Sequence, residues 1–318
     1  MDMSPTVFNN ETMFRKALFA TLVLSQFGFS EPGKKIRVAL TYDDLPACGA
    51  ETPGLSRQEI SDRIIKQLKD HKVEKAYGFV NGLVLENQAT RYDILQQWKR
   101  AGHLIGNHTY SHFDYAKTSF QDFRKDIERN ETFLLDFSDS IAELKVLRLP
   151  FLQEGETKEK RYELRSYLTR RNYQIAQVTI DFQDWGYHEA FVRCRESKNK
   201  TGLAELKSLY LKGAEDNFDN TMNASMNIWG MRDIPHILLL HYNAPTSEWG
   251  NELLALYEAK GAVYVPSDSG IRDQFYNEDS VFWGPVGKTY IHQALEARKI
   301  TTFVRPPLPK ERLDAICR

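Results

Sequence analysis

The sequence predicts an α/β protein in which crossover helices connect the strands of a parallel sheet. Three observations support this fold class. Apolar strand-like segments alternate with segments of helical periodicity between residues 36 and 265. Polar clusters follow the strand-like segments, at the end where α/β barrels form their active sites. The chain of 318 residues is long enough for one large domain, and an α/β barrel lies within that size range.

The composition is ordinary for a soluble globular protein. Hydrophobic residues make up 42% of the chain and charged residues 27%, and the formal net charge is −1. A nucleic-acid partner would require a clustered excess of basic residues, which the sequence lacks. We therefore expect no nucleic-acid partner. The composition does not indicate an oligomeric state.

Strands and helices alternate through the first half of the predicted domain. Residues 36–41 form an apolar strand. Ser56 and Glu59 form a capping box, which begins a helix that runs to about residue 71. The next predicted elements are strand 76–80, helix 90–100, strand 103–107, a helix capped by residues 118–121 that runs to about residue 137, strand 146–149 and helix 157–171.

The second half is less regular. Strands are predicted at residues 174–180, 237–240 and 262–265, with a helix at residues 248–260. Residues 193–235 are charged and rich in Asn, so we expect an insertion with one helix near residues 203–211, which serves as a substrate-facing lid or as plain surface. Residues 283–318 are expected to form a C-terminal extension packed on the barrel, with a helix at residues 288–298.

The first 30 residues have the pattern of an export signal. Arg15 and Lys16 precede an apolar run at residues 17–29, and Gly28 and Ser30 offer small side chains for cleavage before Glu31. The run is too short to predict a membrane span. We expect residues 1–30 to direct export to the periplasm, the cell envelope or the exterior, with no stable span after cleavage. The alternative is an N-terminal helix that packs on the domain of a cytoplasmic protein.

Three cysteines leave at least one thiol unpaired. A bridge between Cys194 and Cys317 is compatible with an exported protein, but the sequence does not establish it. Cys48 follows Asp44 by four residues, and we interpret it as a small, partly buried loop residue rather than a nucleophile.

Two adjacent carboxylates and two histidines form the most informative pattern. Asp43 and Asp44 follow the first predicted strand. His108 and His112 follow the third, four residues apart. One carboxylate oxygen and two imidazole nitrogens can hold a divalent cation and leave coordination positions open. We predict that Asp44, His108 and His112 bind zinc or a similar divalent ion. A histidine pair alone is more often found on a surface or at a helix cap, and the adjacent carboxylates at a strand end reverse that preference.

Acid and base candidates lie near these ligands in the predicted topology. Asp43, beside the predicted ligand Asp44, would be the general base that takes a proton from water at the metal. His241 follows the apolar strand at residues 237–240 and would be the general acid that protonates a leaving nitrogen. Arg148 could pair with Asp43 and keep it ionised. Asp184 could hold the imidazole of His241 in its acid form.

Each of these residues also has a structural interpretation. His241 could be a buried histidine that is satisfied by backbone groups. Arg148 and Asp184 could be ordinary ion-pair partners. Trp185 offers an aromatic face to the C–H groups of a sugar, or it packs in the core. The sequence lacks a Gly-x-Ser-x-Gly elbow, a Walker loop and a dinucleotide fingerprint, so metal-assisted hydrolysis is the reaction class that it favours.

Five motifs in order resemble those of the polysaccharide deacetylase family, also called the NodB-homology domain or carbohydrate esterase family 4. They are Thr-Tyr-Asp-Asp at residues 41–44, His-x-x-x-His at 108–112, Arg-Leu-Pro-Phe at 148–151, Asp-Phe-Gln-Asp-Trp at 181–185 and Leu-Leu-His at 239–241. The resemblance covers about residues 35–270.

The resemblance implies a single-domain, distorted (β/α) barrel of the NodB-homology type, with the catalytic domain at residues 31–282. It implies a divalent metal, usually zinc, and a backbone oxyanion donor near Phe151. The implied roles are metal ligands at Asp44, His108 and His112, a base at Asp43 positioned by Arg148, an acid at His241 tuned by Asp184, and substrate contacts at Tyr42, Phe151 and Trp185.

The implied reaction is hydrolysis of an N-acetyl group on an amino sugar, with release of acetate. Peptidoglycan or poly-N-acetylglucosamine is expected ahead of chitin as the carbohydrate substrate. A second hypothesis is a hydrolase of a non-sugar amide or imide, which a closed, narrow pocket over the metal would favour. An open groove lined by Trp185 or Trp249 would favour the polysaccharide. A third is a glycan-binding module without catalysis, against which the intact acidic and histidine residues argue.

Overall fold

A parallel sheet of seven strands forms the centre of the described structure. The computed structural model describes residues 35–86 and 89–318, together with Met1. The strand order is β5-β4-β3-β2-β1-β6, and β7 pairs with β1. Every strand pairing is parallel, as the sequence predicted. The strands are β1 (Ile36–Leu45), β2 (Tyr77–Val80), β3 (Leu104–Asn107), β4 (Val146–Leu147), β5 (Gln174–Ile175), β6 (His236–His241) and β7 (Ala262–Tyr264).

One segment joins the two edges of the sheet and makes it a distorted barrel. The N–H groups of Gln174 and Ala176 donate to carbonyl groups of the β4 region. A few residues later, Ile180 forms a bridge with Leu238 of β6. The predicted strand at residues 174–180 is therefore divided: its first part is the edge strand β5, which pairs with β4, and its end bridges β6 at the opposite end of the sheet. The predicted strand at 146–149 is likewise shorter in the structure, where β4 ends at Leu147.

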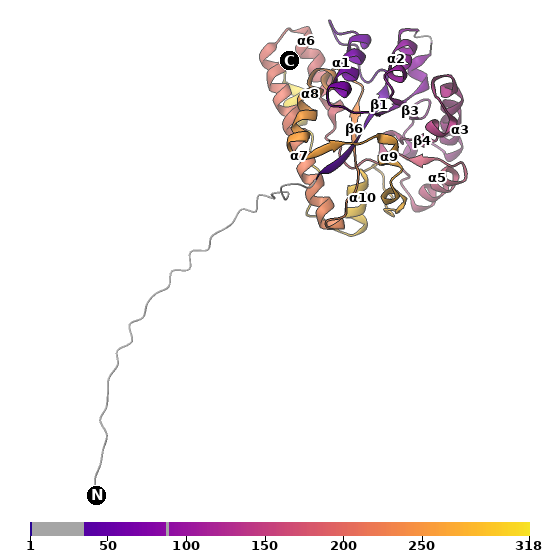
Figure 1. The fold of residues 1–318 in the computed structure, drawn as a ribbon, viewed down its shortest axis with the longest axis vertical. Helices are drawn as coiled ribbons and strands as arrows, with labels where there is room; N and C mark the ends of the chain where they lie inside the picture. The colour runs from indigo at the N-terminus through magenta and orange to yellow at the C-terminus, as the bar shows by residue number, and fades with distance from the viewer. Residues whose placement is uncertain (2–34, 87–88) are drawn as a thin grey trace. The chain divides into compact units, whose positions relative to one another are not determined.

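Helices surround these strands (Figure 1). The first half of the chain follows the predicted alternation, and the predicted capping box of Ser56 and Glu59 is present at the start of α1. The helices are α1 (Arg57–Asp70), α2 (Ala89–Arg100), α3 (Phe120–Leu134), α4 (Ile141–Leu144), α5 (Lys158–Arg170), α6 (His188–Glu196), α7 (Lys200–Trp229), α8 (Ala244–Ala259), α9 (Ser267–Ile271), α10 (Tyr290–Ala297) and α11 (Lys310–Ala315).

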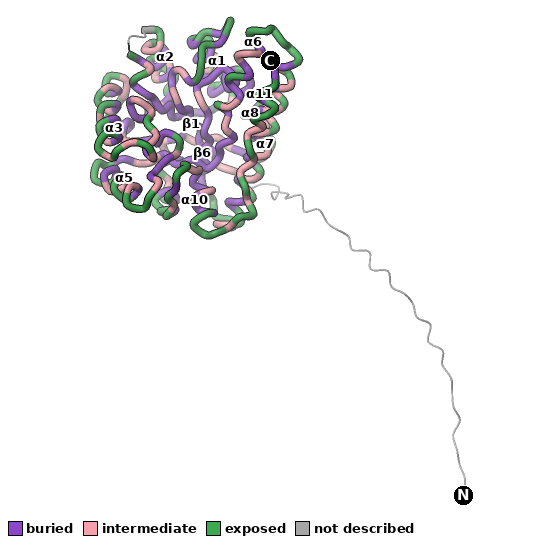
Figure 2. The backbone as a smooth tube through the Cα atoms, turned by 180° about the vertical axis from the view of Figure 1, so that it is seen from behind, coloured by how far each residue is buried: buried purple, intermediate pink, exposed green. Residues whose placement is uncertain are grey.

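Both faces of β1 are buried, as expected for a strand inside an α/β barrel. Leu40 and Tyr42 belong to the same core cluster as Ile64 of α1 and Leu253 of α8. Ala39, on the opposite face, belongs to a second cluster that includes side chains of β2 and β6. Figure 2 shows the strands buried at the centre and the exposed residues on the outer helical surface. This packing fixes the direction of each side chain along β1, including those at its polar end.

The prediction for residues 193–235 was wrong in two respects. Instead of one short helix near residues 203–211, a helix of 30 residues, α7, occupies most of the segment. Its buried residues include Leu206, Tyr210 and Phe218, which belong to the main core cluster. The segment is thus a wall of the barrel and not a lid. The apolar side chains recur at helical spacing over the whole segment, but the charged residues between them obscured this period.

The C-terminal extension packs against the rest of the described chain. Residues 35–318 form one compact unit. The N–H of Tyr290 donates to the carbonyl of Val178, and Cys317 forms a disulfide with Cys194 of α6. Cys48 is a free, buried thiol. The predicted helix at 288–298 agrees closely with α10.

The predicted export signal at residues 1–30 lies outside the described residues. None of the helices in residues 35–86 and 89–318 combines the length and the apolar character that crossing a membrane requires.

The disulfide should stabilise the folded chain, because it closes a loop of 123 residues in the unfolded state. We expect the double variant Cys194→Ser, Cys317→Ser to lose about 2–4 kcal/mol of unfolding free energy, measured by urea denaturation. Dithiothreitol should destabilise the wild type by a similar amount and leave the double variant unchanged. Equal stability of the two proteins without reductant would contradict the expectation.

Candidate active site

The end of β1 brings two adjacent carboxylates to the same place. In a regular strand, Asp43 and Asp44 would point to opposite faces. Tyr42 pairs with Gly78 and Leu45 pairs with Val80, so β1 contains one residue more than β2 over this stretch. Asp44 adopts a left-handed conformation with φ 59°. This local bulge reverses the strict alternation, and Asp43 Oδ2 and Asp44 Oδ1 each lie 3.7 Å from Nε2 of His108.

Asp44, His108 and His112 form a candidate metal site. One donor atom of each residue lies within 4.8 Å of the other two. Asp44 Oδ1 is 3.7 Å from Nε2 of His108 and 3.8 Å from Nε2 of His112. Two donors that each bind one zinc ion at about 2.1 Å can be at most about 4.2 Å apart, so both Asp44 separations fit a shared cation. The two histidine nitrogens lie within 4.8 Å of each other, so they would move slightly closer together when they share an ion. The donor chemistry, one oxygen and two nitrogens, also fits.

A hydrogen bond orients His108 for this role. Its Nδ1 lies 2.8 Å from the backbone carbonyl oxygen of Arg148, which can only accept. Nδ1 therefore carries the hydrogen, and the lone pair of Nε2 faces Asp44. Burial, and after it the neighbouring His112, lowers the pKa of His108 to about 3. A neutral imidazole is the form that binds a metal.

Arg148 pairs with Asp43 inside the barrel. Nη1 of Arg148 lies 3.2 Å from Oδ1 of Asp43 and 3.3 Å from Oδ2, and the side chain of Arg148 is 0% exposed. Its other nitrogens donate to Thr41 Oγ1 and to the carbonyl of Ala176. Burial raises the pKa of Asp43 to about 6, although the charges of Arg148 and His241 oppose the rise.

His241 faces the same site from the end of β6. Asp43 and His241 are direct neighbours in the β1–β6 register. Nδ1 of His241 lies 2.7 Å from Oδ1 of Asp184, and its backbone N–H donates to Oδ2 of the same carboxylate. Burial would lower the pKa of His241, but Asp184, followed by Asp44 and Asp43, raises it to about 10. The imidazolium is therefore the stable form in the metal-free protein.

Phe151 and Trp185 are exposed beside these groups. The ring of Phe151 is 57% exposed and lies 4.7 Å from the ring of His112, in an edge-on arrangement. Trp185 is 50% exposed in the turn that also carries Asp184. Both remain predicted substrate contacts.

Two other aromatic residues are not where the sequence analysis expected them. Tyr42 is 1% exposed, and its ring packs against Trp98 and Tyr242, so the prediction of a substrate contact was wrong. Tyr42 points away from the site because it precedes Asp43 on a strand whose side chains alternate. Trp249 is 4% exposed and packs against Phe191 and Tyr210, so it does not line a groove.

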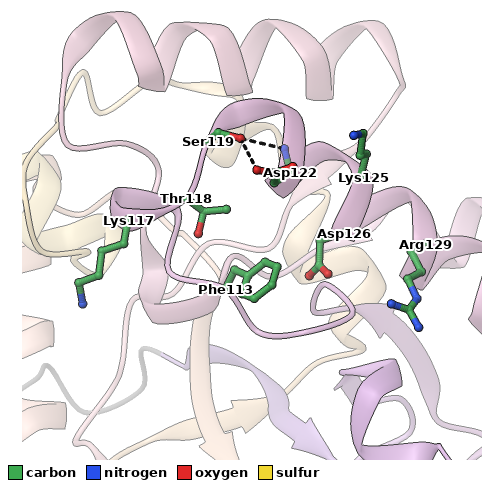
Figure 3. A pocket seen from close by; sticks show the side chains of 8 residues that line it. All are labelled: Phe113, Lys117, Thr118, Ser119, Asp122, Lys125, Asp126 and Arg129. Carbon is green, nitrogen blue, oxygen red and sulfur yellow. Dashed lines mark hydrogen bonds between the residues drawn. The ribbon is translucent and has the colours of Figure 1, made fainter.

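Two hollows lie beside the loop that carries His112. A pocket of about 230 Å³ is lined by Asp44, His112, Cys48 and Asn81, among others. A larger hollow of about 510 Å³ lies where Phe113, the residue after His112, meets residues of α3 (Figure 3). Asp44 and His112 therefore border a hollow in the described surface.

The sequence analysis missed several residues that hold the predicted groups in place. Asp184 also accepts hydrogen bonds from Asn243 Nδ2 and Thr246 Oγ1. Cys48 donates a side-chain hydrogen bond to Asp44. Asn243 caps α8, and its spacing from Thr246 is a recognisable capping signal, but nothing in the sequence links that cap to Asp184.

The comparisons with known proteins agree with this geometry. The sequence profile described as polysaccharide deacetylase matches residues 30–168. Over these residues the chain is similar to the polysaccharide deacetylase family. A peptidoglycan-N-acetylglucosamine deacetylase of Bacillus cereus is 33% identical over 159 residues, which are 50% of this chain and 50% of that protein. A peptidoglycan-N-acetylglucosamine deacetylase of Listeria monocytogenes is 24% identical over 154 residues, 48% of this chain and 28% of that one.

Among solved structures, a CE4 family pseudoenzyme mutant with restored enzymatic activity has a TM-score of 0.51 and 18% identity, over 76% of this chain and 69% of that one. The likeness supports the distorted barrel fold. The chain spans half the length, or less, of the curated relatives it matches.

Removal of a predicted ligand should disrupt the candidate metal site. We expect His112→Ala to weaken zinc binding by more than the ~10–100-fold that loss of an outer hydrogen-bond partner costs. Elemental analysis and calorimetry would measure the effect, with His71→Ala of the α1 C-terminus as the matched control. Undiminished zinc content in His112→Ala would remove this residue from the ligand set.

The protonation of His241 provides an independent test in the metal-free protein. Its pKa is raised from the ordinary 6.5 to about 10, so its contribution to stability is complete below pH 6.5 and is lost as the pH rises through about 10. An NMR titration should follow the imidazole, and Asp184→Asn should lower its pKa, whereas Asp62→Asn on α1 should not. A wild-type midpoint near 6.5 would contradict the arrangement.

Proposed function

We propose that this protein is a metal-dependent hydrolase that removes N-acetyl groups from an amino-sugar polysaccharide or oligosaccharide and releases acetate. One observation carries the proposal: the triad Asp44, His108 and His112 lies directly beside the buried pair of Asp43 and Arg148. His241, paired with Asp184, neighbours Asp43 on the adjacent strand. This set contains a cation site, a base and an acid, which are the groups that amide hydrolysis needs.

Zinc is the cation that the donor set fits best. Two imidazole nitrogens and one carboxylate oxygen form a three-ligand protein site, which is typical of catalytic zinc. A divalent cation held there would supply Lewis-acid chemistry, which polarises an acyl carbonyl and increases the acidity of water. The hydrogen bond from His108 Nδ1 to the Arg148 carbonyl keeps Nε2 available for such an ion.

Asp43 acts as the general base in this proposal. Its pKa of about 6 leaves it ionised at pH 7 while keeping it basic enough to accept a proton. Arg148 holds the carboxylate through two contacts of 3.2 and 3.3 Å and prevents it from turning away. Asp43 therefore receives the proton that water loses as it attacks the acyl carbon.

His241 acts as the general acid. Asp184 holds its Nδ1 at 2.7 Å, so the remaining ring nitrogen carries the proton that is delivered to the leaving amine. The backbone N–H near Phe151 is the proposed oxyanion donor. Trp185, half-exposed in the turn of Asp184, offers an apolar face for a sugar ring.

An envelope polysaccharide is the substrate class that we favour. The curated relatives are named for deacetylation of N-acetylglucosamine in peptidoglycan. The hollow that Asp44 and His112 border in the described surface suits a polymer better than a small amide. The disulfide between Cys194 and Cys317 is typical of proteins in oxidising compartments, which supports export directed by residues 1–30.

Acetate release from a small panel of substrates tests the proposal. The panel contains peptidoglycan, chitooligosaccharides, acetylated xylan and simple amides, each with and without chelator. We expect acetate from the amino-sugar polymers, loss of activity with chelator and recovery with zinc. Acetate release from simple amides alone would favour the non-sugar hydrolase instead, and tight glycan binding with no acetate from any substrate would favour a binding module.

The base assignment has a separate test. We expect Asp43→Asn to lower kcat by about 10²- to 10⁴-fold, as is typical when a general base is lost, while bound zinc is retained. Asp62→Asn, a neutralised carboxylate on α1, is the matched control and should behave like the wild type. Acetate release by Asp43→Asn at the wild-type rate would refute the assignment.

A further inference from the structure

The C-terminal extension lies directly against the loop that carries Phe151. The N–H of Gly284 donates to the carbonyl of Gly155 at 3.2 Å. Nε2 of Gln153, a buried side chain, donates to the carbonyl of Gly284 at 3.2 Å. Residues 284–287 therefore run beside residues 151–155. Gly284 is hydrogen-bonded both to the backbone of Gly155 and to the side chain of Gln153.

Gly287 makes the closest approach. A Cβ at this position would lie 2.6 Å from the carbonyl oxygen of Leu152 and closer still to that of Phe151. These neighbours are backbone atoms, which cannot move aside as the end of a flexible side chain can. Glycine is thus required here by contact and not by an unusual φ, and the extension packs backbone to backbone on the loop.

The loop has a conformation that needs such support. Phe151 and Leu152 are consecutive non-glycine residues with φ of 56° and 55°. This left-handed region is unfavourable for residues with a side chain and persists only where the surroundings enforce it. The ring of Phe151 is largely exposed, so its own packing contributes little. Besides the hydrogen bonds within the turn, contact with the extension constrains this backbone.

The extension also contacts the loop that carries Asp184. Arg305 pairs with Asp181 Oδ2 at 2.5 Å and donates from Nε to the carbonyl of Asp181. The side chain of Leu308 lies against Gly186, where a Cβ would be 3.0 Å from Leu308 Cδ1. The two loops that flank the site, at residues 150–155 and 181–187, are therefore both contacted by the same C-terminal segment.

We propose that Gly287 is a positioning residue, through which the C-terminal extension holds the backbone of Phe151 and Leu152 in the geometry that the reaction needs. The catalytic part of this inference rests on the proposed deacetylase function. The extension is then part of the active-site architecture and not an appendage. Its effect acts through the loop, because Gly287 itself touches neither the metal ligands nor the predicted acid and base in the contacts described.

Amide hydrogen exchange tests whether Gly287 holds the loop in place, and it requires no activity assay. The N–H groups of Leu152 and Gln153 donate to Leu149 and Pro150 carbonyls. In the zinc-loaded full chain, Gly287→Ala should accelerate exchange at residues 151–153 by about tenfold or more, because the loop opens locally more often. Gly284→Ala is the matched control: the nearest neighbours of its Cβ would be ring atoms of Phe282 and not loop backbone, and its own backbone hydrogen bonds are kept, so exchange should stay at the wild-type rate.

Steady-state kinetics test whether the position of the loop affects the reaction. A displaced oxyanion donor weakens transition-state contacts more than ground-state binding. We expect Gly287→Ala to lower kcat for acetate release by roughly 10- to 100-fold, with KM and zinc content close to those of Gly284→Ala. Gln153→Ala, which removes the side-chain bond to Gly284, should change exchange and kcat in the same direction, and it serves if Gly287→Ala does not fold.

The outcomes separate this inference from the proposed function. Unchanged exchange in Gly287→Ala, or equal acceleration in Gly284→Ala, overturns the positioning role. Accelerated exchange with unchanged kcat overturns the catalytic link. If the wild type releases no acetate, the proposed function fails and with it the catalytic link, while the exchange data still decide whether the extension holds the loop.

Discussion

The buried guanidinium of Arg148 is the interaction on which the site depends. A charge that is withdrawn from water must find partners, and a charge left without them is strongly destabilising. Arg148 bonds to Asp43, Thr41 and the carbonyl of Ala176, while its own carbonyl accepts the hydrogen of His108. One residue therefore fixes the predicted base, orients a predicted metal ligand and links three segments of the barrel.

The charged neighbours of the predicted base and the predicted acid give these two groups different pKa values. Asp43 and His241 are neighbours on adjacent strands, yet their surroundings differ. Asp43 has Arg148 as its partner and a pKa of about 6, whereas His241 has Asp184 and a pKa of about 10. Near neutral pH the carboxylate can thus accept a proton while the imidazolium can donate one, which is the division that hydrolysis of an amide requires.

The fold was predictable wherever a local pattern recorded it. The spacing of apolar residues predicted the parallel sheet and most of the helices. The capping box of Ser56 and Glu59 predicted the start of α1. The long helix α7 was missed because charged residues between its apolar side chains obscured the helical period. The closure of the barrel by residues 174–180 was not predicted either. A strand that pairs first with one neighbour and then with another has the same sequence pattern as an ordinary strand.

The sequence by itself determined which residue types are available: two adjacent carboxylates, two histidines four residues apart, and the further histidine at 241. Only the tertiary structure decided where they point. Strict alternation would separate Asp43 from Asp44, and the left-handed bulge at Asp44 brings them together. The same alternation turns Tyr42 into the core. The proposed role of Gly287 could not be predicted from the sequence either. It depends on contact with a loop more than 130 residues away in the chain, and no local pattern records that contact.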